Sequence, residues 1–170
     1  MPATYEPIAT TTLSVGASSI IFSSIPATYT DLRLVVVAFD GATDLTTFNL
    51  FARYQTAANY SQTRLIGDGS AASSNRITST SLIHLTSATT LADNTTTPTM
   101  AELDIFNYAG STFKTALVRT SNDQNGSGSL EYCVSLWQDT SAINELRVLA
   151  GGGMNLKAGT TATLYGILKA

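Results

Sequence analysis

The sequence has one cysteine, one histidine and few charged residues, and each scarcity excludes a class of function. Charged side chains make up 12% of its 170 residues, against roughly 25% in an average globular domain. Cys133 cannot form an internal disulfide, and one cysteine and one histidine do not make a zinc ligand set. We therefore expect neither a disulfide framework nor a metal centre built on His or Cys.

Positive charge and long apolar runs are also scarce. Nine basic and twelve acidic residues give a net charge of −3, and no cluster of Lys and Arg offers a nucleic-acid surface. No apolar run approaches the roughly 20 residues that span a bilayer. The start, MPATYEPIATTT, lacks the basic and apolar parts of a secretory signal. These absences predict a protein made in a cytoplasm, with no nucleic-acid or membrane partner.

Apolar and polar residues alternate with a period of two along most of the chain, between clusters of Gly, Ser, Asn and Asp. This pattern is typical of strands joined by polar turns, whereas helical periodicity is nearly absent. We expect strands over 6–13, 17–23, 30–38, 47–54, 60–66, 76–85, 99–106, 113–120, 130–138, 144–150 and 160–168. The predicted fold class is all-β: an antiparallel, jelly-roll-like β-sandwich.

No shift in composition marks a second domain, so residues 1–170 are expected to form a single β-sandwich domain. The segment 1–12 allows two interpretations. It is either an N-terminal arm that contacts a neighbouring subunit or, as we favour, the first strand of its own sheet. Pro26 is expected to fix a corner before the strand 30–38, with Tyr29 packed there. Because Val35 and Val37 add apolar residues to the second face, we expect this strand in a sheet covered on both sides.

Two other strands predict which side chains face the core. In LEYCVSLWQ, residues 130–138, the expected inward set is Leu130, Tyr132, Val134 and Leu136, with Trp137 on the opposite face. In AELDIF, residues 101–106, Glu102 and Asp104 are expected to face outwards.

The search for catalytic or binding chemistry gives no catalytic residue, no metal site and no cofactor site. His84 has no G-x-S-x-G nucleophile near it and is interpreted as structural. Glu102 and Asp104 lie on one strand face, whereas the carboxylates of glycoside hydrolases flank a cleft. Four aspartates in expected loops lack the spacing of a calcium loop and are interpreted as turn caps: Asp40, Asp44, Asp68 and Asp93. We expect no enzymatic activity.

Aromatic residues are the remaining lead. The side chains of Trp137, Tyr29 and Tyr60, with Tyr54 and Tyr108, could stack against a sugar ring. They could equally anchor a subunit interface, where Trp and Tyr are enriched, or pack in the core. We favour interface or core over a sugar platform.

The strand faces are rich in Ser and Thr and carry little charge. Charge is a common means of keeping sheet edges from pairing with other chains. Neutral faces can also be buried against a neighbour without the cost of desolvating ions. This composition predicts a subunit that associates with copies of itself.

Three segments resemble a family of small virion proteins of tailed bacteriophages, including cyanophages and other aquatic phages. They are TTLSVGASSIIFSSIPATYTDLRLVVV (11–37), NYSQTRLIGDGSAASS (59–74) and AGTTATLYGI (158–167). The segment FARYQTAAN (51–59) departs from the family, whose members tend to carry a Gly-containing turn after Arg-Phe. The resemblance implies no catalytic motif and brings no site residues.

The resemblance implies a virion structural protein, made in the host cytoplasm, that decorates or cements the capsid. Its expected partners are itself, as a homotrimer, and the major capsid protein. The alternative is a tail or tail-fibre component that binds host surface glycans. An enzyme is the weakest of the three interpretations.

Overall fold

The computed structural model describes residues 4–39, 49–56, 59–86, 97–123 and 126–168. Within these ranges the secondary structure is entirely β, and no helix is present that could cross a membrane. The strands are β1 (Tyr5–Thr12), β2 (Ser19–Ser23), β3 (Asp31–Ala38), β4 (Leu50–Tyr54), β5 (Tyr60–Gly67), β6 (Ala72–Thr80), β7 (Ile83–His84), β8 (Thr99–Ile105), β9 (Lys114–Asp123), β10 (Gly128–Trp137), β11 (Glu145–Ala150) and β12 (Thr161–Ile167).

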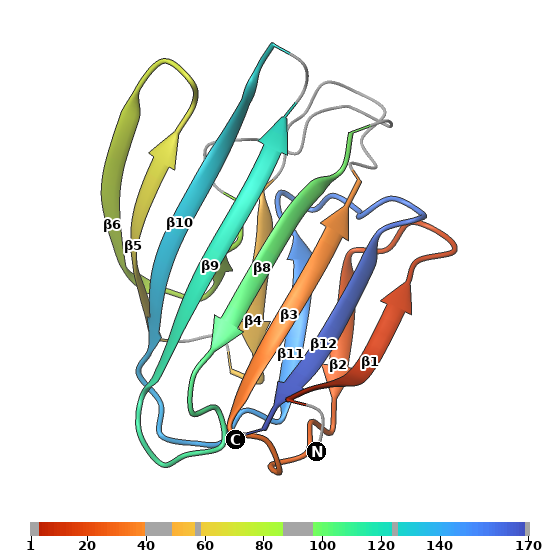
Figure 1. Ribbon diagram of the computed structural model, residues 1–170, viewed down its shortest axis with the longest axis vertical. Helices are drawn as coiled ribbons and strands as arrows, with labels where there is room; N and C mark the ends of the chain where they lie inside the picture. Colours follow the sequence, from red (N-terminus) through yellow and green to blue (C-terminus); the bar gives the residue numbers. More distant parts are fainter. Residues whose placement is uncertain (1–3, 40–48, 57–58, 87–96, 124–125, 169–170) are drawn as a thin grey trace.

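The strands form two antiparallel sheets. The larger has eight strands in the order β1-β12-β3-β8-β9-β10-β5-β6, and the smaller has four in the order β2-β11-β4-β7. In Figure 1 the smaller sheet lies behind β8, β3 and β12, whereas the hairpin of β5 and β6 extends past its side. This arrangement confirms the predicted antiparallel β-sandwich. The jelly-roll part of the prediction is not confirmed, since a jelly roll has eight strands in its two sheets.

The core lies between the two sheets, where apolar side chains from alternate positions meet. Leu32, Leu34 and Val36 of β3 are fully buried, as are Leu146 and Val148 of β11. The alternation that predicted these strands therefore also predicted their inward faces. Burying one such side chain contributes about 1.5–3 kcal/mol, so this row is a large part of what holds the sheets together.

The corner before β3 forms as the sequence predicts, with Tyr29 packed in it. The backbone N–H of Tyr29 donates a hydrogen bond to the Tyr108 hydroxyl at 3.3 Å, and that hydroxyl donates to the carbonyl of Pro26. The ring of Tyr29 lies against Gly166 of β12 so closely that a Cβ there would come within 2.3 Å of Tyr29 Cγ. Glycine at position 166 is thus required by the tyrosine at the corner.

One expectation about β3 is wrong. The sequence predicted a strand covered on both faces, but Val35 and Val37 are only half-buried and none of the described segments covers them. Their apolar character is explained by neighbours on the same face, since the register places Met100 of β8 opposite Val37. Among the residues that the structure describes, the outer face of the eight-stranded sheet is therefore open.

The N-terminal segment follows the favoured interpretation. Residues 5–12 form β1, which pairs antiparallel with β12 of the same chain, and its register shifts between Pro7 and Ala9. A proline and an irregular register are means by which proteins protect an edge strand from further pairing. In the single chain these residues thus form the first strand of their own sheet, and a contact of this edge with a neighbouring subunit stays a prediction.

Candidate functional site

The most distinctive surface of the molecule is the outer face of β10. Leu130, Tyr132 and Val134 point away from the core and are 51%, 48% and 47% exposed. The residues between them face inwards: Glu131, Cys133, Ser135 and Trp137 are all buried. This orientation reverses the sequence prediction. A period of two separates two sets of side chains, but it does not say which set faces the core.

The burial of Trp137 shows why the polar set faces inwards. Its indole lies 5.1 Å from the ring of Tyr54 and 6.3 Å from that of Tyr60, measured between ring centroids. These three rings are a large part of the core at that end of β10, and they bring Ser135 and Cys133 in with them. The larger apolar area of an aromatic cluster outweighs that of the aliphatic side chains on the other face.

The three aromatic residues singled out in the sequence do not lie together on a surface. Trp137 and Tyr60 are buried in the core, so their rings are not accessible to a sugar or to another subunit. Tyr29 is half-buried at the corner, where its hydroxyl donates to Glu6 Oε2 at 3.3 Å. A platform of Trp137, Tyr29 and Tyr60 is therefore contradicted by their positions.

The register of the strands arranges the outer face into rows that run across the sheet. Tyr132 of β10 lies beside Leu65 of β5 on one side and Arg119 of β9 on the other. Leu65 is 52% exposed, so it extends the apolar surface of β10. We call Leu65, Leu130, Tyr132 and Val134 the apolar strip. Large exposed side chains gathered in this way are typical of interaction surfaces.

A cluster of four charges borders the apolar strip on β3, β8 and β9. Arg33 Nε lies 2.5 Å from Asp104 Oδ1, and Arg119 Nη2 lies 3.0 Å from Asp104 Oδ2. Arg119 Nη2 also lies 2.8 Å from Glu102 Oε2. The hydrogen bond to Asp104 raises the pKa of Arg33. Two cations and two anions are thus paired within one chain, and the cluster is neutral.

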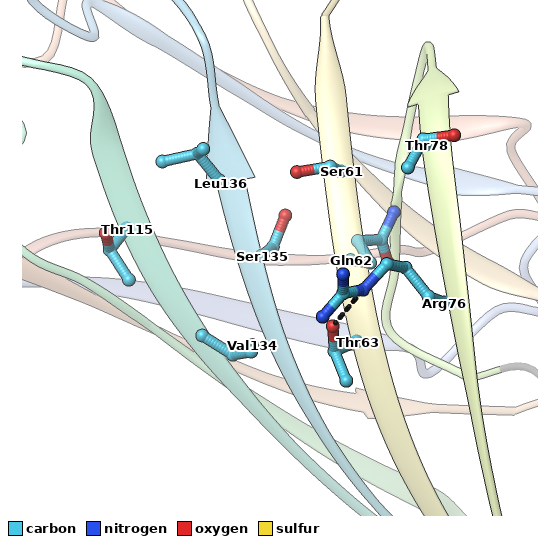
Figure 2. Close-up of a pocket in the computed structure, with 9 residues that line it drawn as sticks. All are labelled: Ser61, Gln62, Thr63, Arg76, Thr78, Thr115, Val134, Ser135 and Leu136. Carbon is cyan, nitrogen blue, oxygen red and sulfur yellow. Dashed lines mark hydrogen bonds between the residues drawn. The ribbon is translucent and has the colours of Figure 1, made fainter.

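A hollow of about 350 Å³ lies beside the strip, over β9, β10, β5 and β6 (Figure 2). Hydroxyl groups and aliphatic side chains line it, among them Thr63, Val134 and Leu136. Arg76 of β6 reaches across its floor, and its Nε donates to Thr63 Oγ1 at 3.2 Å. The lining offers van der Waals contact, neutral hydrogen bonds and the cation of Arg76 to whatever enters the hollow.

His84 and Cys133, which a nucleophilic mechanism would need, are poorly suited to catalysis. Burial lowers the pKa of His84 to about 4, helped by the nearby Arg64 guanidinium. Burial raises the pKa of the Cys133 thiol to about 12. At neutral pH neither the imidazolium nor the thiolate is populated, so this histidine and cysteine do not form a reactive pair. The interpretation of His84 as structural agrees with this geometry, and Cys133 is buried.

Of the four aspartates expected in loops, the structure describes Asp68. The other three, Asp40, Asp44 and Asp93, lie outside the described residues. Asp68 caps its own turn: Oδ1 accepts hydrogen bonds from the backbone N–H groups of Ser70 and Ala71. These bonds lower the pKa of Asp68 to about 2. In the described part of the chain, no three His, Cys, Asp or Glu side chains come together as a metal site.

Lys114 is a buried residue that the sequence did not point to. Its side chain is fully buried, with Nζ 2.5 Å from the carbonyl oxygen of Thr112 and 5.8 Å from the centroid of the Trp137 ring. Burial lowers the pKa of Lys114. The pairing of β9 with β10 places Lys114 opposite Trp137, and this pairing cannot be read from the sequence alone. The carbonyl and the ring stabilise the ammonium in place of water.

Comparisons of the chain with protein families, with curated proteins and with solved structures find no match. The outer face of the eight-stranded sheet, with the apolar strip on β10 and β5, is therefore the candidate site that the residues themselves define.

Proposed function

We propose that the chain is a structural protein of a bacteriophage virion: a decoration or cement protein that docks on the head lattice as a homo-oligomer and stabilises it. The sequence resemblance over 11–37, 59–74 and 158–167 supports the phage assignment. The single observation that carries the self-association is the open outer face, where four large apolar side chains lie beside an already paired charge cluster.

The physical reason concerns desolvation. Covering a charge costs several kcal/mol unless a partner compensates it. Asp104 already has its two arginines in the same chain, so docking a neutral surface on this face does not create an unpaired charge. Each contact is weak, but many identical contacts on a repeating lattice add up through avidity. Such a protein needs no active site.

The partners proposed are the chain itself, as a homotrimer, and the major capsid protein or other virion proteins. The proposal places the protein in the virion after synthesis in the host cytoplasm. It includes no catalytic residue, cofactor, nucleic acid or membrane. The alternative, a tail or tail-fibre component that binds host glycans, is less well supported because two of its three aromatic residues, Trp137 and Tyr60, are buried.

Counting copies in purified virions tests this proposal. Quantitative mass spectrometry should find the chain on the order of hundreds of times per particle, close to the number of major capsid subunits measured in the same sample, because every equivalent lattice site is filled. A count of tens or fewer would favour the tail alternative. Absence of the chain from particles that contain capsid and tail proteins would reject both assignments.

A further inference from the structure

We propose that a second copy of this chain docks face to face on the apolar strip, with a twofold axis along β10 that sets Tyr132 against its own equivalent. This inference deepens the self-association part of the proposed function and rests on it. It names the surface that joins two copies and assigns the contact of that surface to the chain itself rather than to the capsid.

The position of β10 in the sheet suits such an axis. Five strands, beginning with β9 and β8, lie on one side of it, and two, β5 and β6, lie on the other. A twofold axis along β10 therefore sets β9 of one copy over β5 of the next, and β8 over β6. Twofold contacts of this kind use the same patch on both copies, which must be complementary to itself.

The outer face meets that requirement for apolar contact. With the axis along β10, Leu130, Tyr132 and Val134 each face the same residue of the second copy. Leu65 of β5 then lies over the aliphatic stem and guanidinium of Arg119, because both belong to the row of Tyr132. Guanidinium groups pack well on apolar and aromatic side chains, so Leu65 of the second copy can cover Arg119 with favourable contacts.

The charges are also complementary in this arrangement. Asp104 of β8, Val134 of β10 and Arg76 of β6 belong to one row, through Leu117 and Thr63. The axis therefore sets Arg76 of each copy over Asp104 of the other, with Glu102 in the next row. Arg76 forms no ion pair with any residue that the structure describes, and its cation is available for these carboxylates. Across these rows a second copy brings opposite charges together.

The area is sufficient for a stable pair. Five strands about 4.8 Å apart, each contributing about eight residues of about 3.4 Å, span roughly 650 Å² on one copy. Two copies would bury about 1,300 Å², within the range of about 1,200–2,000 Å² for specific interfaces. The hollow beside the strip lies inside this area and can accept side chains of the second copy (Figure 2).

Two sheets that pack face to face do so with their strands nearly aligned, and an axis along β10 gives that alignment. The contact joins copies in pairs. The assembly should therefore contain two chains, or six if a separate threefold contact joins such pairs. Analytical ultracentrifugation of the full chain should give a mass of two or six times 17.9 kDa. A mass of three times that value would overturn the inference and leave the proposed homotrimer standing, whereas a mass of one times that value would overturn both the inference and the homo-oligomer of the proposed function.

A charge exchange at Tyr132 tests the axis itself. Tyr132→Glu and Tyr132→Lys, each alone, should weaken self-association by about 100-fold, because two like charges then face each other in the contact. An equimolar mixture should recover association, since glutamate of one copy faces lysine of the other. If the mixture stays as weak as either variant, Tyr132 does not face itself and the inference is wrong.

Matched controls separate the contact from general effects of charge. Ile21→Glu changes a similarly exposed apolar residue on β2 of the smaller sheet, and it should leave the mass unchanged. Arg76→Glu should weaken pairing by about tenfold, whereas Arg147→Glu, the same change in charge on the smaller sheet, should not. Equal effects of the Arg76 and Arg147 variants would contradict the proposed alignment. Far-UV circular dichroism of each variant checks that the β-sandwich is intact.

Discussion

At the scale of single residues, the question for Trp137 is whether it stabilises the core or binds a partner. Its burial against Tyr54 and Tyr60 leads us to expect that Trp137→Ala lowers the free energy of unfolding by about 3–5 kcal/mol. Urea denaturation monitored by circular dichroism measures this loss. Phe113→Ala, which removes a half-exposed ring, should change the free energy of unfolding by less than about 1 kcal/mol. Wild-type stability of the Trp137 variant would contradict the core assignment.

His84 leads to a prediction about pH. The pKa of its imidazole is lowered from an ordinary 6.5 to about 4 in the folded chain. Between these values the unfolded chain binds a proton that the folded chain does not, so the free energy of unfolding should fall as pH falls from 6.5 to 4. Urea titrations at several pH values measure the slope, which should be smaller in His84→Gln because the chain has no other histidine. An equal slope in both proteins would show that another group titrates there.

Single residues also show where sequence analysis fails. The pattern in LEYCVSLWQ separated the two faces of β10 correctly, yet the apolar set proved to be the outer one. The orientation depends on Trp137 meeting Tyr54 and Tyr60, which lie about 80 residues earlier in the chain. Lys114 was missed for the same reason, since the ring that covers its ammonium group belongs to Trp137 on another strand. Contacts between distant segments leave no local pattern.

At the scale of elements, strand existence was more predictable than strand length or pairing. Strong alternation in β3, β8 and β11 gave both their location and their inward faces. The single strand expected over 76–85 is in fact two, β6 and the short β7, which belong to different sheets. Ser79 in β6 has a φ of 56°, a left-handed conformation that few non-glycine residues adopt. The polar residues around it gave no sign in the sequence that the strand ends there.

Two strands of the larger sheet, β3 in its interior and β6 at its edge, should differ in how often their backbone hydrogen bonds open. β3 pairs on both sides, with β12 and β8, and its inward side chains are fully buried. Of the described strands, β6 pairs only with β5, and nearly all of its side chains are exposed. Local opening costs least where few apolar contacts and many solvent-exposed hydrogen bonds hold an element. Hydrogen–deuterium exchange at low concentration should therefore be at least about 100-fold faster for β6 amides than for β3 amides.

The same measurement at high concentration distinguishes two roles of β6. If copies pair face to face, its amides lie within the contact and their exchange should slow as the protein associates. Amides of the smaller sheet serve as the internal control, because that sheet lies on the far side of the sandwich. Uniform exchange of β6 at all concentrations would show that the hairpin of β5 and β6 lies outside any contact between copies.

At the scale of the whole molecule, the proposed self-association depends on how charge is distributed rather than on how much there is. The net charge is only −3, and the charges bordering the apolar strip are already paired within one chain. Composition alone predicted a neutral surface suited to assembly. It did not predict which face would be open, because that follows from eight strands forming one sheet while four cover only part of it.

This distribution of charge predicts how self-association should depend on salt. An interface driven by opposite net charges weakens steeply as ions screen it, whereas burial of apolar side chains does not. Raising sodium chloride from about 0.05 M to about 0.5 M shortens the screening length from roughly 14 Å to roughly 4 Å. Because the apolar strip supplies most of the contact, the association constant from sedimentation equilibrium should change by less than about threefold. Arg76→Gln provides the control, since it removes the proposed ion pairs between copies and should make the salt dependence smaller still. A loss of tenfold or more in the wild type would mean that charge, and not the strip of Leu65, Leu130, Tyr132 and Val134, holds the copies together.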